Sequence, residues 1–150
     1  MTTTFDTLRD LLASEVGLAT IATIRRNGQP LLSVVNVGVL VHPVTGAEVL
    51  GFVANGRSAR LGHLRHRPHL TVSARRDWRW AAAEGAAELI GPDDPYPGFD
   101  PAGLPALLRA IFEAAGGTHD DWATFDRVMA DERRCAVLLR PDRIYSNPGR

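Results

Sequence analysis

The sequence contains no lysine, and all seventeen of its basic residues are arginine. Without lysine the chain cannot form a lysine Schiff base, which excludes the usual covalent chemistry of pyridoxal phosphate. An anionic ligand would instead meet guanidinium groups, whose planar N–H forks suit phosphate and carboxylate. The lack of lysine therefore favours bidentate recognition of an anion over covalent catalysis.

Cysteine is almost absent as well. Cys135 is the only one, so an intramolecular disulfide framework and a paired-cysteine redox or zinc site are excluded. It lies in the apolar run Cys135–Leu139, and we expect it to be a small buried hydrophobe. No serine-hydrolase elbow, zinc-protease helix motif or dinucleotide-binding glycine motif occurs.

Long hydrophobic runs are also missing. No apolar run reaches the roughly 18 residues that a membrane span needs. The first ten residues lack the basic and apolar segments of a secretory signal. We therefore expect a cytoplasmic protein with no membrane partner.

Net charge is zero, with seventeen basic and seventeen acidic residues, but the two signs are separated along the chain. Residues 57–83 hold seven arginines and one acid, whereas residues 84–132 hold eleven acids and two arginines. The arginines fall on several predicted elements, so we expect a compact phosphate-bearing ligand and no nucleic-acid partner. The acidic helices predicted within 101–132 should lie away from that ligand.

Apolar periodicity and turn residues divide the first half of the chain into short elements. Phe5, Leu8 and Leu12 share one helical face, which predicts a helix ending near Gly17. Asn27–Gly28 is typical of a hairpin turn. A short helix is predicted over 59–66, with Ser58 as its N-cap. The pattern predicts strands over 18–24, 30–41, 48–54, 69–75 and 79–90.

The second half is predicted to be mainly helical. Asp100–Pro101 starts a helix that ends at Gly116–Gly117. Thr118–Asp121 resembles a capping box before a helix over 121–131. A last strand follows over 135–140, with 143–145 as its extension. Strand and helix do not alternate, so we predict one α+β domain over 1–150, a small antiparallel β-barrel with helices packed outside.

The most informative local motif surrounds residues 51–58. Gly51 to Ser58 nearly matches the phosphate loop of nucleotide triphosphatases, but Arg57 replaces its lysine and Phe52–Ala54 completes a strand. The free N–H groups of a helix starting at Ser58 still favour an anion, and Arg57 and Arg60 flank that end. Three histidines at 63, 66 and 69 have metal-like spacing, but the neighbouring arginines would repel a cation, so we expect no metal site.

Four segments of the chain are informative together: Ala22–Pro30, Arg57–Pro68, Trp80–Gly85 and Glu132–Tyr145. In their order and spacing they resemble the pyridoxamine 5′-phosphate oxidase-like proteins, a family of split β-barrels that bind flavins. The stretch 119–122 followed by Glu132–Arg134 is similar to the actinobacterial branch that uses the deazaflavin coenzyme F420.

This resemblance implies a cofactor bound across the barrel at a homodimer interface. Arg60 stands where relatives often have lysine. His63, an expected cofactor contact on the ring side, stands where they often have asparagine. Trp80, from the third segment, is a further expected cofactor contact. The phosphate contacts would be Ala54, Asn55, Arg57, Ser58 and Arg60, and the ring would lie over Ser33, Val35 and Asn36.

The resemblance also implies a function. The expected activity is F420-dependent oxidoreduction, in which the reduced cofactor gives hydride to a small conjugated acceptor. One alternative is an FMN-dependent enzyme like pyridoxamine 5′-phosphate oxidase, and another is a non-catalytic cofactor-binding protein. No residue is identified as a catalytic acid or base.

Overall fold

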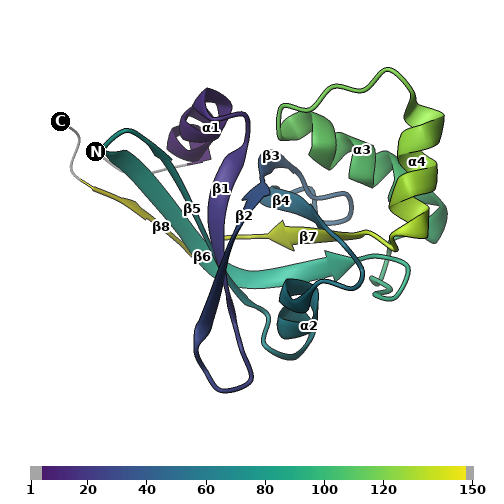
Figure 1. Cartoon of the computed structure of the whole chain (residues 1–150), viewed down its shortest axis with the longest axis horizontal. Coiled ribbons are helices and arrows are strands. Elements are labelled where there is room, and N and C mark those ends of the chain that lie inside the picture. Colours follow the sequence, from purple (N-terminus) through teal and green to yellow (C-terminus); the bar gives the residue numbers. More distant parts are fainter. Residues whose placement is uncertain (1–4, 148–150) are drawn as a thin grey trace.

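The structure is a computed structural model in which residues 5–147 are described. Its first half begins with α1 (Phe5–Ser14) and contains most of the strands (Figure 1). These are β1 (Leu18–Ile24), β2 (Pro30–Asn36), β3 (Gly38–Val41), β4 (Glu48–Ala54), β5 (His69–Arg76) and β6 (Arg79–Ile90), with α2 (Ala59–His66) between β4 and β5. The second half holds a short 3₁₀ turn (Pro101–Gly103), α3 (Leu104–Ala114), α4 (Trp122–Asp131), β7 (Cys135–Leu139) and β8 (Arg143–Ser146).

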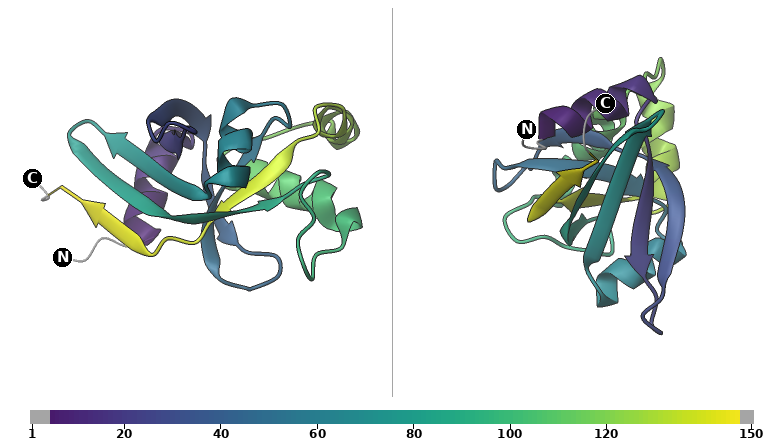
Figure 2. Two further views of the ribbon diagram at one scale, coloured as in Figure 1. Left: turned by 90° about the horizontal axis from the view of Figure 1, so that it is seen from below. Right: turned by 90° about the vertical axis from the view of Figure 1, so that its left-hand side faces the viewer.

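All strands join one antiparallel sheet in the order β2-β1-β5-β6-β7-β4-β3, with β8 also on β6. The long strand β6 makes this possible, because residues 79–86 pair with β5 and residues 87–90 pair with β7. The sheet curls around one core, and the helices lie outside it (Figures 1 and 2). The predicted α+β split barrel with outer helices is therefore confirmed.

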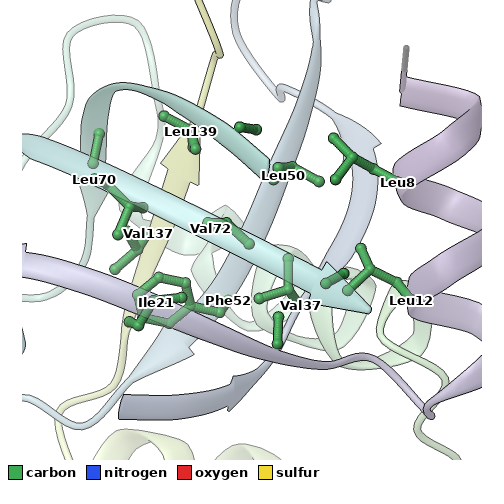
Figure 3. Close-up of a cluster of buried hydrophobic side chains, with 14 of the residues drawn as sticks. Leu8, Leu12, Ile21, Val37, Leu50, Phe52, Leu70, Val72, Val137 and Leu139 are labelled. Carbon is green, nitrogen blue, oxygen red and sulfur yellow. The ribbon is translucent and has the colours of Figure 1, made fainter. Parts of the chain in front are cut away.

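Two apolar clusters hold this arrangement together. The first fills the barrel, where Phe52, Ile21 and Leu139 are at most 1% exposed (Figure 3). The second lies outside the barrel, between β4, β7 and the pair α3–α4. Strand β7 is buried on both faces, because alternate residues enter the two clusters. This double burial explains its unbroken apolar sequence.

The predicted strand over 30–41 is wrong as a single element. Residues of β2 pair with β1, whereas residues of β3 pair with β4 on the other side of the barrel. Val37 lies at the crossing, fully buried, and its N–H donates to the carbonyl of Gly17 at 2.7 Å. An apolar, β-branched run thus continues through a change of partner that local propensity cannot reveal.

Three local predictions also need correction. Asp121 caps α4 by accepting from the N–H of Thr124, so Thr118 is not the cap. Ser58 occupies the N-cap position of α2 but makes no side-chain cap bond. Residues 143–146 form a separate strand, β8, which pairs with β6 and does not extend β7. Within residues 5–147, no helix is long and apolar enough to cross a membrane.

Candidate functional site

The turn between β4 and α2 is fixed by its own hydrogen bonds. The Asn55 side-chain oxygen accepts from the N–H of Arg57 at 3.0 Å, and the Asn55 carbonyl accepts from the N–H and hydroxyl of Ser58 at 3.0 and 2.8 Å. Gly56 passes so close to Arg133 that an added Cβ would lie 2.5 Å from its carbonyl oxygen. The hydrogen bonds of Asn55 therefore fix the turn, and position 56 has room only for glycine.

This turn presents an uncapped, positively charged helix start. The Ser58 hydroxyl is bound to Asn55, so it does not satisfy the N–H groups of the first helical turn. That turn contains no acidic residue to offset its partial positive charge. Arg57 is exposed, and within the described chain it forms no ion pair. The physical requirements of an anion site are met here.

Polar contacts fasten α2 to the β1–β2 hairpin. The Arg60 Nε donates to the Ser33 hydroxyl at 3.3 Å, and the Nδ1 of His63 lies 3.1 Å from the Thr23 hydroxyl. One turn later, the Nε of Arg67 donates to the carbonyl of Ile24 at 2.8 Å. The structure therefore joins two predicted site residues, Ser33 and Arg60. It also gives His63 a structural partner, the buried Thr23, that local sequence patterns do not identify.

The other predicted residues of β2 point in different directions. Val35 is on the same face as Ser33 and packs partly against the barrel core. Asn36 is on the opposite face, where its side-chain N–H donates to the carbonyl of Val16 at 3.0 Å. Ala54 is fully buried where β4 pairs with β7, so it positions the turn through its backbone.

Trp80 lies away from the other predicted residues. Its ring packs edge-on against Tyr145, with ring centres 6.0 Å apart. The backbone N–H of Trp80 donates to the side-chain oxygen of Asn147. Along β6, Trp80 is ten residues before Ile90, which pairs with Ala136 of β7. Ala136 in turn pairs with Val53, two residues before Asn55. At about 3.3 Å per residue, ten residues of strand span roughly 33 Å. Within one chain, Trp80 and the turn at Asn55 do not form one site.

A neighbouring turn completes the region. Because Ala54 pairs with Cys135, the segment Glu132–Arg134 lies against the start of α2. The Glu132 carboxylate accepts from Asn55 at 3.4 Å and from Arg134 at 3.1 Å, and its carbonyl accepts from the N–H of Gly56 at 3.0 Å. Glu132, which directly follows α4, is thus an acid at the edge of the candidate site, and the expectation that the acidic helices themselves lie away from the ligand stays a prediction.

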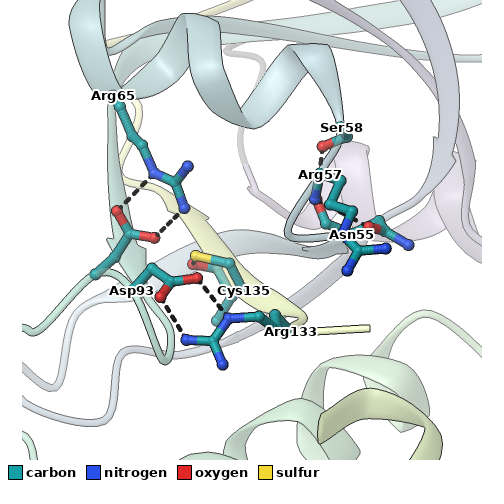
Figure 4. A network of polar contacts seen from close by, with 9 residues as sticks. Asn55, Arg57, Ser58, Arg65, Asp93, Arg133 and Cys135 are labelled. Carbon is teal, nitrogen blue, oxygen red and sulfur yellow. Dashed lines mark hydrogen bonds and ion pairs between the residues drawn. The ribbon is translucent and has the colours of Figure 1, made fainter. Parts of the chain in front are cut away.

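Two arginines of this region, Arg65 and Arg133, are paired with aspartates. Arg65 binds both carboxylate oxygens of Asp94, at 2.9 and 2.8 Å, and Arg133 binds both oxygens of Asp93. The hydrogen bonds from Arg133 lower the pKa of Asp93 below its ordinary value. Figure 4 shows these pairs apart from the cluster of Asn55, Arg57 and Ser58. Arg65 and Arg133 therefore have a structural use that Arg57 lacks.

The thiol of Cys135, near these pairs, is unreactive because it is buried. It is 1% exposed, and desolvation raises the pKa of its thiol to about 12. An uncharged, buried thiol is a poor nucleophile, in agreement with the expectation that it serves packing. Among residues 5–147, no group of three or more histidine, cysteine, aspartate or glutamate side chains is placed to hold a metal ion.

No protein-family model matches the sequence. The fold is similar to a pyridoxamine 5′-phosphate oxidase-related, FMN-binding protein from Nostoc punctiforme, with a TM-score of 0.64 and 17% identity over 97% of this chain and 86% of that one. An F420 reductase is similar over 85% of this chain and 88% of its own, with a TM-score of 0.58 and 15% identity.

A third similar structure binds a different cofactor. It is a haem-binding protein from Mycobacterium smegmatis, with a TM-score of 0.61 and 17% identity over 98% of this chain and 59% of that one. Identities this low establish architecture and leave the choice of ligand open. The chain has the split-barrel fold of the pyridoxamine 5′-phosphate oxidase-like proteins.

Proposed function

We propose that this chain is an oxidoreductase that binds coenzyme F420 and transfers hydride from the reduced cofactor to a small conjugated acceptor. The observation that carries the proposal is the start of α2, where uncapped N–H groups and the unpaired Arg57 meet. FMN, which also bears a phosphate, is the alternative cofactor. Proteins of this fold include both an F420 reductase and an FMN-binding protein.

The chain's own residues would bind and orient the cofactor, which itself supplies the hydride chemistry. Arg57 and the first amides of α2 would hold the phosphate by charge-assisted hydrogen bonds. Arg60, already directed at Ser33, would link the phosphate to β2. Ser33, with Val35 behind it, would face one edge of the ring.

The direct test is titration of the purified chain with F420, FMN and haem, followed by fluorescence and absorbance. We expect saturable binding of F420, with FMN weaker and haem weakest. Turnover of the bound, reduced cofactor over a panel of conjugated acceptors then separates an enzyme from a cofactor-binding protein. Tight haem binding without binding of either phosphorylated cofactor would contradict the proposal.

The site would lie at the interface of a homodimer. The outer face of β1 and β2 carries exposed apolar side chains, with Leu32 and Val34 each more than 60% exposed and Leu18 close by. A second copy covering this face would remove that apolar surface from water. Sedimentation should give a dimer at micromolar concentration, and Val34→Glu should give a monomer. A stable monomer of the unchanged protein would contradict this assembly.

A further inference from the structure

A cavity of about 270 Å³ lies between the barrel and the helical pair α3–α4. Its wall is mainly apolar, with Phe112 and Ile111 from α3, Phe125 and Met129 from α4, and Val53 from β4. Phe112 and Phe125 lie 5.1 Å apart between ring centres. The wall therefore suits a flat apolar body, such as one or two fused rings.

Two polar side chains line the same cavity, Arg134 and Asn36. The Nε–H and one Nη2–H of Arg134 donate hydrogen bonds to the Glu132 carboxylate, at 3.3 and 3.1 Å. A guanidinium has five N–H donors, so three of them remain for a ligand. The Asn36 side chain uses its N–H on the carbonyl of Val16, which leaves its oxygen as an acceptor. The cavity thus combines an apolar wall with a charged donor.

Glu132 connects this cavity to the start of α2. Its carboxylate binds both Asn55, in the candidate phosphate turn, and Arg134, in the cavity wall. The cavity wall and the candidate phosphate turn are therefore joined through the Glu132 side chain.

We infer that this cavity binds a small, planar, apolar molecule bearing an anionic carboxylate, with the carboxylate on Arg134. Calling this molecule the hydride acceptor rests on the proposed function, whereas binding itself does not. A carboxylate accepts two parallel N–H bonds from a guanidinium, and the ring would pack against Phe112, Phe125 and Met129.

Methionine-methyl NMR tests the inference without any cofactor. The chain has two methionines, Met1 and Met129, so a sample labelled at the methionine methyls gives one cavity signal and one internal reference. The probe is 2-naphthoate, and its neutral analogue is 2-naphthalenemethanol. We expect 2-naphthoate to shift the Met129 signal with saturation, about tenfold more tightly than the neutral analogue.

Arg134→Met should weaken 2-naphthoate binding about tenfold and leave binding of the neutral analogue unchanged. The matched control is Arg127→Met, which removes an exposed α4 arginine that is not in the cavity wall and should change neither affinity. The preference of the unchanged protein for the carboxylate is a readout that does not depend on whether the variant folds.

A Met129 signal that does not respond to 2-naphthoate, or responds equally to both probes, overturns the inference. So does an Arg134→Met variant, folded by circular dichroism, that keeps the full preference for the carboxylate. Failure of the proposed function looks different, since 2-naphthoate would bind while F420 and FMN would not. Failure of this inference alone leaves cofactor binding intact.

Discussion

The two ends of α2 use arginine in opposite ways. At its start, Arg57 forms no ion pair within residues 5–147, and Arg60 donates to the uncharged Ser33. At its end, Arg65 binds both oxygens of Asp94, next to the pair of Arg133 and Asp93. In the sequence these arginines look alike. Their roles differ because the fold brings Asp94 to Arg65, whereas no acid of residues 5–147 forms an ion pair with Arg57.

The largest effect should come from adding a methyl group at Gly56, where the turn before α2 meets the segment Glu132–Arg134. In Gly56→Ala the new Cβ would lie 2.5 Å from the carbonyl oxygen of Arg133, so backbone must move. We expect a loss of about 1–3 kcal/mol in the free energy of unfolding, together with weaker cofactor binding. Urea denaturation and cofactor titration measure the two losses.

Gly62→Ala is the matched control, because an added Cβ there meets no atom within 4 Å. Position 62 is inside α2, so alanine should stabilise the protein by about 0.5–1 kcal/mol. Equal destabilisation by both substitutions would show that the contact between the two turns is unimportant.

A smaller, selective effect is expected for Arg57→Ala. Loss of a charge-assisted bond to phosphate should weaken F420 or FMN binding about tenfold to hundredfold. Stability should stay unchanged, since Arg57 is exposed and unpaired. Arg26→Ala, in the exposed β1–β2 turn, is the control. If both variants bind the cofactor equally well, Arg57 does not contact it.

Arg65→Ala should lower the stability of the fold and leave cofactor binding unchanged, the opposite of Arg57→Ala. It removes the partner of Asp94, whose side chain is 13% exposed, and the loss of this bidentate pair should cost about 1 kcal/mol in the free energy of unfolding. Cofactor affinity should be unchanged, because the charge of Arg65 is already neutralised. A tenfold loss of cofactor affinity in this variant would erase the distinction between the two ends of α2.

The smallest effect concerns Asp93 and pH. Its folded-state pKa lies below the ordinary 3.8 because of Arg133. Its stabilising contribution is therefore present above pH 3.8 and is lost as the pH falls through the lower, folded-state pKa. Urea midpoints should differ between the unchanged protein and Asp93→Asn at neutral pH and converge in acid. A difference that grows in acid would have the wrong sign.

Local signals were enough for most of the fold. The strand over 48–54 and the helix over 59–66 are bounded by turn residues and apolar spacing, and both lie where the sequence predicts them. The crossing at Val37 was missed because its cause is a change of pairing partner. No periodicity within β2 and β3 records that change.

Residue patterns alone predicted the candidate site only where it is contiguous, whereas Ser33 on β2 was expected from the family resemblance. Ala54 to Arg60 lie together because one turn carries them, and a phosphate-loop-like pattern reveals that turn. Thr23 and Glu132 reach the site through pairing of distant strands, which a single sequence does not specify. The pairing of Ala54 with Cys135 is the structural fact that would have pointed to Glu132.

The most direct test compares each cofactor with its phosphate-free form. For F420 or FMN, whichever binds, the affinity ratio between the phosphorylated and phosphate-free forms is measured in the unchanged protein and in Arg57→Ala. If the phosphate lies at the start of α2, the unchanged protein should prefer the phosphorylated form by about tenfold or more, and Arg57→Ala should lose most of that preference. An equal preference in both proteins would contradict a phosphate site at this helix start.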